Sequence, residues 1–313
     1  MATDSIKFGK NMVSREELLS SGHRACQGCG LAINIRLALK VLGKDTICMT
    51  PASCWSGVGS MYPDAAWEIP WMQTLFENVS PVAGGINAAH KILEEKGKRP
   101  HRKINSLCFA GDGATADIGL GSLSGTLERG HDIIYICMDN EAYMNTGIQR
   151  SSATPHGAST TTTPVGRVQS GQQTQKKDVP AIITDHHIPY VATACASYPF
   201  DYMEKVRKAA EVDGPAYIHV FSVCPTGWHI APERTIDVGK LAVETGIFPL
   251  YEVENDVYKL NVKPAKLKPV EEYVKMQGRF RHLKPDEIAE MQENVTRNWG
   301  ALLKRIEASQ VPA

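Results

Sequence analysis

The sequence has no excess of charge, because 34 basic side chains balance 34 acidic ones among its 313 residues. This balance argues against nucleic acid or an anionic membrane surface as a partner. The sequence also has no apolar run of about 18 residues, which a membrane-spanning helix needs, and its first residues lack the apolar core of a signal peptide. We therefore expect a soluble, cytoplasmic protein. Internal repeats are absent, so the length allows one large α/β domain or two smaller ones.

Disulfides are a further feature that we do not expect, because the eight cysteines stand in a chain without an export signal. Four of them lie in apolar, strand-like runs, where a thiol behaves as a small buried side chain: Cys48, Cys108, Cys137 and Cys195. The other four lie on loops beside glycine or proline: Cys26, Cys29, Cys54 and Cys224. A Cys-x-x-Cys pair is common to zinc sites, redox dithiols and iron–sulfur sites. The loop thiols therefore predict a metal centre but leave the metal open.

The middle of the chain has a strand–helix–strand pattern. An apolar run over 104–110 is followed by Gly111-Asp112-Gly113 and by a helical pattern over 117–128. A second apolar run, over 133–138, ends at Asp139-Asn140. Polar residues thus follow both predicted strands at their carboxyl ends, where open α/β sheets bind ligands.

The residues at these two strand ends suit a phosphate and a cation. Gly111 and Gly113 allow backbone amides to approach a phosphate, and the positive end of the following helix points the same way. Asp112 and Asn140 supply oxygen ligands from neighbouring strands, as Mg²⁺ bound to phosphates requires. A Gly-Asp-Gly segment alone is as often a simple tight turn. Its pairing with Asn140 after a second strand favours the cofactor interpretation.

Hydrophobic periodicity predicts the remaining elements. The predicted helices are 31–42, 80–95, 200–212, part of 230–246 and a C-terminal helix over 288–306, and the predicted strands are 46–50, 190–195, 216–222 and a hairpin over 248–262. Residues 150–178 show no periodicity and are expected to form a lid, a binding loop or a disordered segment. The apolar stripe of the C-terminal helix must pack on its own domain or on a partner.

Two motifs carry a family resemblance. Gly111-Asp112-Gly113 followed by Asn140 resembles the signature of thiamine diphosphate enzymes, and the run 139–147 resembles the 2-oxoacid:ferredoxin oxidoreductases. The resemblance covers nearly the whole chain and is close to the β subunits of the heteromeric, pyruvate-type members. Among these, the N-terminal arm and Cys54-Trp55-Ser56-Gly57 are most similar to the oxalate oxidoreductase β subunit.

This resemblance implies a fold and a set of site residues. We expect an α/β, thiamine diphosphate-binding fold with a mostly parallel sheet flanked by helices, over residues 1–228. A helical and hairpin extension, 229–313, would pack on this domain or on a partner subunit. The implied magnesium ligands are Asp112, Asn140 and the Ala142 carbonyl, and the implied ligands of one 4Fe–4S cluster are Cys26, Cys29, Cys54 and Cys224. The implied cofactor-binding residues are Ser53, Cys54, Gly111, Asp112, Gly113, Ala114, Asn140, Ala142, Met144, Asn145 and Thr146, with Asn145 over the thiazolium ring as the catalytic residue.

The resemblance also implies an activity that depends on other subunits. The expected reaction is oxidative cleavage of oxalate to carbon dioxide, with electrons passed through the cluster to ferredoxin; the alternative substrate is pyruvate, which would yield acetyl-coenzyme A. The chain lacks the glutamate that activates thiamine, so an α subunit is expected to supply it together with part of the pocket for a small 2-oxoacid. A ferredoxin-like subunit or domain would carry electrons onward. Leu31 stands where single-chain members often carry Glu after the first cysteine motif.

Two remote alternatives belong to other classes. A non-redox thiamine enzyme would leave the four loop cysteines without a function. A non-catalytic, metal-binding electron-transfer scaffold would leave the Gly-Asp-Gly unit without one.

Overall fold

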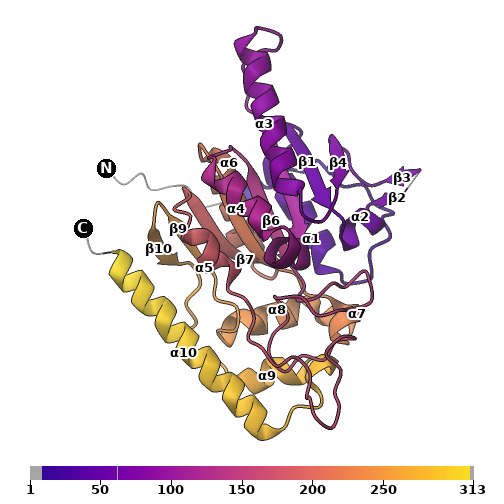
Figure 1. Ribbon diagram of the computed structural model, residues 1–313, viewed down its shortest axis with the longest axis vertical. Coiled ribbons are helices and arrows are strands. Elements are labelled where there is room, and N and C mark those ends of the chain that lie inside the picture. The colour runs from indigo at the N-terminus through magenta and orange to yellow at the C-terminus, as the bar shows by residue number, and fades with distance from the viewer. Residues whose placement is uncertain (1–8, 62, 311–313) are drawn as a thin grey trace.

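The computed structural model of the protein describes residues 9–61 and 63–310. Part of the predicted N-terminal arm, 1–8, and the end of the predicted extension, 311–313, lie outside the described residues. The centre of the fold is an eight-stranded sheet (Figure 1). Its strands are β1 (Thr46–Pro51), β4 (Trp71–Thr74), β5 (Asn105–Gly111), β6 (Ile134–Asp139), β7 (Tyr190–Cys195), β8 (Ala216–Phe221), β9 (Tyr251–Glu254) and β10 (Val257–Leu260). A separate small hairpin joins β2 (Ser60–Met61) to β3 (Asp64–Ala65).

The strand order from edge to edge is β10-β9-β7-β8-β6-β5-β1-β4. The strands from β7 to β4 in this order are all parallel, whereas β9 and β10 are antiparallel additions at the other edge. Strands β6, β7 and β8 are buried along their whole length, as parallel strands covered on both faces must be. The predicted mostly parallel sheet is confirmed, and the edge strand β4 is an element that the sequence pattern did not predict.

Helices cover both faces of the sheet. On one face α1 (Gly30–Leu42) and α6 (Pro199–Glu211) pack on alternate strand residues such as Leu107 and Phe109. On the other face α3 (Val79–Glu95), α4 (Leu120–Glu128) and α5 (Val179–Thr184) pack on residues such as Cys108 and Ala110. The end of α3 projects beyond the sheet (Figure 1). The four cysteines predicted to be inert are buried in the strands, as expected: Cys48, Cys108, Cys137 and Cys195.

Two helix starts differ from the prediction. Helix α3 begins at Val79 after Asn78, so Ser80 and Pro81 lie inside its first turn and do not begin it. After β5 the chain becomes helical at once and forms a π-helical turn, η2 (Ala114–Ile118), before α4. The turn closes through a bond from the Gly119 N–H to the Ala114 carbonyl, 2.9 Å. Such π turns recur at functional sites.

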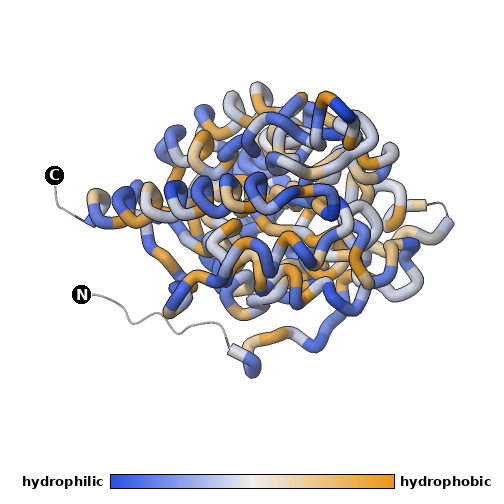
Figure 2. Tube along the Cα trace, turned by 90° about the horizontal axis from the view of Figure 1, so that it is seen from below, coloured by the Kyte–Doolittle hydropathy of each residue, from blue (hydrophilic) through white to orange (hydrophobic). Residues whose placement is uncertain are grey.

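The C-terminal part adds further helices and the two antiparallel strands. The remaining elements are η1 (Lys10–Met12), α2 (Cys54–Val58), α7 (Pro225–Trp228), η3 (Pro232–Arg234), α8 (Thr235–Glu244), α9 (Val270–Lys275), η4 (Gly278–Phe280) and α10 (Pro285–Ser309). Helix α10 alternates polar and apolar residues along its length (Figure 2) and buries Val295 and Leu302 of the predicted stripe against its own chain. Because β9 pairs with β7, the C-terminal extension continues the main sheet. The predicted domain boundary after residue 228 stays a prediction.

The segment 150–178 contains no helix or strand, yet it is packed. Ser151, Ala153 and Ala158 are fully buried, and the segment closes on itself through a hydrogen bond from the Gly157 N–H to the Gln172 carbonyl, 2.7 Å. Among the three forms expected of it, the disordered one is therefore wrong. Within the described residues, none of the helices combines the length and the apolar composition that a membrane crossing requires.

Candidate active site

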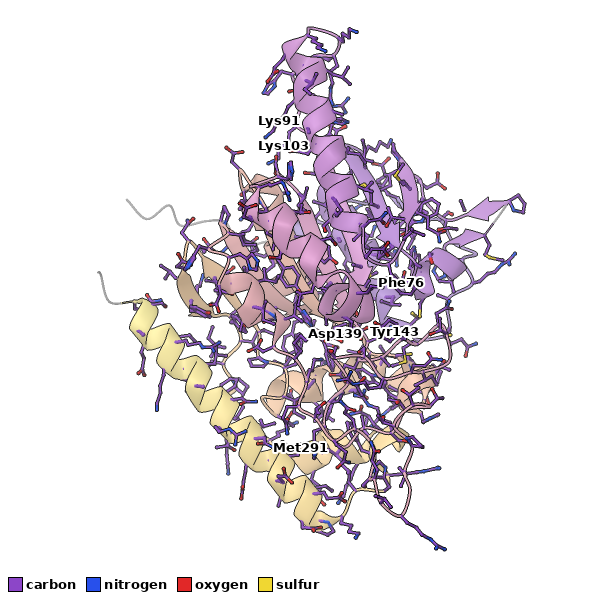
Figure 3. The ribbon with its side chains drawn as sticks, in the orientation of Figure 1. Phe76, Lys91, Lys103, Asp139, Tyr143 and Met291 are labelled. Atoms are coloured by element: carbon purple, nitrogen blue, oxygen red, sulfur yellow. The ribbon has the colours of Figure 1, made fainter. Side chains whose placement is uncertain are left out.

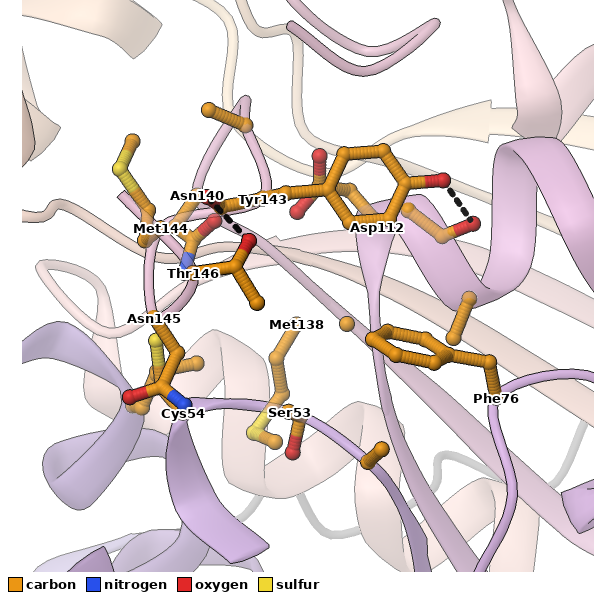
Figure 4. A pocket seen from close by; sticks show the side chains of 16 residues that line it. Ser53, Cys54, Phe76, Asp112, Met138, Asn140, Tyr143, Met144, Asn145 and Thr146 are labelled. Atoms are coloured by element: carbon orange, nitrogen blue, oxygen red, sulfur yellow. Dashed lines mark hydrogen bonds between the residues drawn. The ribbon is translucent and has the colours of Figure 1, made fainter. Parts of the chain in front are cut away.

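The carboxyl ends of β5 and β6 lie side by side, because the two strands pair in parallel with Gly111 opposite Met138. Asp112 follows β5, Asn140 follows β6, and both side chains are buried. These strand ends and the loop after β1 enclose a pocket (Figure 4). All the predicted cofactor-binding residues line it: Ser53, Cys54, Gly111, Asp112, Gly113, Ala114, Asn140, Ala142, Met144, Asn145 and Thr146.

Three polar groups meet at one point of this pocket. One terminal atom of the Asn140 amide lies 3.0 Å from Asp112 Oδ1 and 2.8 Å from the Ala142 carbonyl oxygen. With the NH₂ group there, the amide donates hydrogen bonds to both oxygens; with its own oxygen there, three oxygens face one another. Octahedral Mg²⁺ holds oxygens at about 2.1 Å, so neighbouring ligands around it lie about 3 Å apart. The predicted ligand set therefore has the spacing that a magnesium ion needs.

The surroundings of Asp112 disfavour the charged form of its carboxyl group. Burial raises the pKa of the Asp112 carboxyl well above its usual value, and the nearby Asp139 adds to the rise. The Ser151 hydroxyl opposes it by donating a hydrogen bond to Asp112 Oδ2, 2.5 Å. No Lys, Arg or His among the described residues lines the pocket. Because a buried carboxylate is costly without positive charge, the site fits a bound cation.

The four loop cysteines line a second pocket beside the first: Cys26, Cys29, Cys54 and Cys224. They come from the loop before α1, the start of α2 and the residue before α7. The two pockets share part of their lining: Leu31, Cys54, Asn140, Met144 and Asn145. The thiols are therefore gathered together and lie next to the oxygen ligands.

The thiols surround their pocket and do not converge on one point. Within residues 9–61 and 63–310, no three His, Cys, Asp or Glu side chains are grouped to hold a single metal ion. Four thiols around one pocket would suit a 4Fe–4S cluster, which takes one thiolate on each of its irons. Burial raises the pKa of Cys54 to about 12 and that of Cys224 to about 11, and neighbouring cysteines contribute to both shifts. The thiolate forms therefore need positive charge inside the pocket, which a cluster would supply.

Two glycines allow the loops around the pockets to approach closely. Gly28, between the first two cysteines, has a φ of 69°, and a Cβ there would lie 2.4 Å from the Pro232 carbonyl oxygen. A Cβ on Gly113 would lie 2.3 Å from the Tyr143 ring. Position 113 must therefore be glycine, because any side chain there would collide with the Tyr143 ring. The expected room for a phosphate lies at Gly111, where a Cβ would meet no atom nearer than Ser53 Cβ at 4.0 Å.

Comparison with known proteins identifies the family. The family described as "Thiamine pyrophosphate enzyme, C-terminal TPP binding domain" matches residues 54–220. The pyruvate synthase subunit PorB of Methanocaldococcus jannaschii is 55% identical over 282 residues, which are 90% of this chain and 95% of that protein. The ketoisovalerate oxidoreductase subunit VorB of Pyrococcus furiosus is 46% identical over 294 residues, which are 93% of this chain and 94% of that protein. The chain belongs to the 2-oxoacid:ferredoxin oxidoreductases, as a β subunit.

The fold of this β subunit has a counterpart among solved structures. The 2-oxoglutarate:ferredoxin oxidoreductase of Magnetococcus marinus, solved with 2-oxoglutarate, coenzyme A and succinyl-CoA bound, matches with a TM-score of 0.55. The match has 24% sequence identity and covers 70% of this chain and 71% of that chain. This match and the family match together confirm the predicted α/β, thiamine diphosphate-binding fold. The relatives are pyruvate and ketoisovalerate enzymes, so the predicted similarity to an oxalate enzyme receives no support.

Several pocket residues of the β subunit were missed from sequence. Phe76, Met138 and Tyr143 line the pocket, with the Phe76 and Tyr143 rings 6.0 Å apart. The Tyr143 hydroxyl donates a hydrogen bond to Asp117 Oδ2, 3.0 Å. Tyr143 could have been found, because it lies inside the run that carries the family resemblance. Phe76 comes from a distant loop, and no local signal marks it.

A buried ionic group beneath the pocket was missed as well. Asp139 accepts a hydrogen bond from His219 Nε2, 2.8 Å, and pairs with Lys176 Nζ at 2.5 Å. Burial alone would raise the pKa of Asp139, but Lys176 and His219 outweigh it and hold that pKa below its usual value. Burial would likewise lower the pKa of His219, yet Cys137 and Asp139 raise it to about 10. Asp139 is therefore a paired carboxylate and is not free to bind a metal.

Proposed function

We propose that this β subunit binds thiamine diphosphate through magnesium beside a 4Fe–4S cluster and, within a complex, oxidises pyruvate to acetyl-coenzyme A and carbon dioxide with ferredoxin as acceptor. The observation that carries this proposal is the shared lining of the two pockets, because Cys54 and Asn145 belong to both. Electrons released from a substrate in the first pocket would have only a short path to a cluster in the second. The high identity to the pyruvate synthase subunit PorB supports the choice of reaction.

The chain's own residues divide into two groups of ligands. Asp112, Asn140 and the Ala142 carbonyl would hold magnesium, and the open space at Gly111 would admit the diphosphate. The cluster ligands would be Cys26, Cys29, Cys54 and Cys224. When bound, thiamine diphosphate supplies an electron sink for decarboxylation and the cluster takes up electrons one at a time.

Asn145 is the residue that we assign to catalysis. It lines both pockets and belongs to the loop after β6, so its amide is in reach of a substrate held between the cofactor and the cluster. An amide can donate and accept hydrogen bonds without adding charge, which suits the orientation of a keto group or carboxylate. Phe76, Met138 and Met144 add apolar surface to the same pocket.

The lining of the two pockets favours pyruvate over oxalate. Oxalate is a dianion and needs cationic contacts, whereas the methyl group of pyruvate needs an apolar wall. Among the described residues, neither pocket is lined by Lys, Arg or His, and the first contains Leu31, Phe76 and Met138. A cationic contact for oxalate would have to come entirely from a partner subunit.

A partner subunit is needed because the pocket has no glutamate. None of the described residues that line it is Glu, so an α subunit would supply the group that activates the aminopyrimidine ring. Leu75 and Ile118 are 64% and 59% exposed, and they adjoin Phe76 and the end of η2. This apolar surface beside the pocket is where we expect the α subunit to dock. A ferredoxin-like subunit or domain would receive electrons from the cluster.

The test is reduction of ferredoxin by the assembled complex under anaerobic conditions. Pyruvate with coenzyme A is expected to support turnover, and oxalate without coenzyme A is expected to support none. The reverse result would contradict the pyruvate assignment. Iron and acid-labile sulfide in the purified complex serve as the control, because their absence would favour a non-redox thiamine enzyme.

A further inference from the structure

The turn that carries two of the proposed magnesium ligands has an unusual residue at its centre. Glu141 lies between Asn140 and Ala142, its φ is 66°, and only 2% of its surface is exposed. A left-handed conformation is unfavourable for a residue other than glycine, and a buried carboxylate is unfavourable without partners. Both costs require the surroundings to hold Glu141 in place.

A lysine holds the turn from one side. Lys176 Nζ lies 2.5 Å from Asp139 Oδ2 and 2.7 Å from Glu141 Oε1, so one cation joins the carboxylates that flank Asn140. Asp139 Oδ1 in turn accepts a hydrogen bond from the Glu141 backbone N–H, 2.9 Å. Lys176 belongs to the segment 150–178, which the sequence left without a function. Figure 3 labels Asp139 next to Tyr143, which lines the first pocket.

An arginine holds the turn from the other side. Arg279 is 3% exposed, and its Nη2 lies 2.5 Å from Glu141 Oε2. Its guanidinium stacks on Trp228, 3.9 Å from the ring centre. The Trp228 indole N–H then donates a hydrogen bond to the Asn140 carbonyl, 3.0 Å. Arg279 comes from the C-terminal extension and Trp228 from the helix that follows Cys224, so distant segments converge on this turn.

We propose that Lys176 and Arg279 are positioning residues that brace the turn 139–142 and thereby direct the oxygens of Asn140 and Ala142 towards Asp112. This inference rests on the proposed function, because it assigns the brace to the magnesium site. The two cations neutralise Asp139 and Glu141, so the charge of Asp112 remains available for the metal. Removing either cation takes away one of the two ionic partners of the buried Glu141 carboxylate and loosens the left-handed residue between the ligands.

The brace is tested by the affinity of the assembled complex for Mn²⁺, used in place of Mg²⁺ with added thiamine diphosphate. The complex is first stripped of both, and free Mn²⁺ is then measured by electron paramagnetic resonance. Lys176→Met and Arg279→Met are expected to weaken Mn²⁺ binding by about 10- to 100-fold, as loss of a residue that orients metal ligands does. The iron content of both variant complexes is expected to stay at the wild-type level.

Lys205→Met is the matched control. Lys205 is also a buried lysine, paired with Asp201 at 2.7 Å and bonded to the Thr193 carbonyl at 2.9 Å, but it lies on α6 and touches no part of the turn. It is expected to lower thermal stability and leave the Mn²⁺ dissociation constant unchanged. If the Lys176 and Arg279 variants bind Mn²⁺ as this control does, the brace is disproved.

Two further outcomes separate failure of the brace from failure of assembly and from failure of the proposed function. If a methionine variant fails to assemble, Trp228→Phe replaces it, because that change removes the indole N–H donor to Asn140 and part of the ring on which Arg279 stacks; wild-type Mn²⁺ affinity in this variant would overturn the proposal. If the wild-type complex itself binds no Mn²⁺ in the presence of thiamine diphosphate, the proposed function fails and the brace with it.

Discussion

The Asn140 side-chain amide has two possible orientations, and we expect a bound cation to choose between them. Without a cation, NH₂ pointing at Asp112 Oδ1 and the Ala142 carbonyl gives two hydrogen bonds. With magnesium present, a half-turn of the amide presents its oxygen at the same place. The backbone does not need to move in this exchange. The site is therefore organised before the metal binds, which reduces the cost of binding.

The cysteines give the sharpest prediction at the scale of single residues. Cys54→Ala is expected to lower the iron and acid-labile sulfide content of the anaerobically purified complex, because it removes one of the four thiols around the second pocket. Cys195→Ala is the control, since Cys195 is buried in β7 and faces neither pocket. It should keep its iron and lose about 1 kcal/mol of stability from the small cavity. Full iron content in Cys54→Ala would contradict the ligand assignment.

At the scale of elements, the hairpin β9–β10 is fastened to the sheet by one buried carboxylate. Glu252 accepts hydrogen bonds from Lys208 on α6 at 2.9 Å, from Tyr190 on β7 at 3.1 Å and from Asn261 at 2.8 Å. Burial favours its neutral form, but the bonds from Lys208 and Asn261 outweigh burial and lower the pKa of Glu252 from 4.5 to about 2. The stabilisation by this carboxylate is therefore complete above pH 4.5 and is lost as the pH falls towards 2.

The lowered pKa of Glu252 leads to a prediction about the stability of the hairpin. Glu252→Gln should lower the free energy of unfolding by about 1–3 kcal/mol at neutral pH, because charged hydrogen bonds are lost. Urea denaturation should show that the difference from wild type shrinks as the pH falls from about 5 to about 2. Glu254→Gln, at the half-exposed partner of Lys208, should cost less than about 1 kcal/mol. A difference that does not change with pH would exclude Glu252 as the titrating group.

At the scale of the whole molecule, the proposed function requires another chain to complete the pocket of this subunit. Among the described residues no glutamate lines the pocket, and apolar side chains stand exposed beside it at Leu75 and Ile118. The single chain should therefore reduce neither ferredoxin nor a dye with pyruvate, even when it is supplied with thiamine diphosphate, magnesium and its cluster. Addition of the α and ferredoxin-like subunits should restore turnover. Turnover by the single chain would contradict the need for a partner, provided that its cluster signal equals that of the complex.

The sequence alone determined the parts of this protein that depend on local pattern. The apolar runs ending at Gly111 and Asp139 identified two buried strands, and the polar residues after them identified the proposed ligands of the first pocket, since neighbouring parallel strands end at one edge of the sheet. Loop position likewise separated the four thiols of the second pocket from the four inert ones. In these cases a short stretch of sequence shows both the chemistry of a residue and whether it stands on a strand or a loop.

Only the tertiary structure decided which distant segments meet. It brought Phe76 to the pocket, and it set Lys176 and Arg279 against the turn at Glu141. No local pattern marks these residues, because their partners lie on segments whose contacts depend on the order of the strands and on packing across the whole sheet. The role of a buried charged side chain can be inferred only when its ionic partners are known.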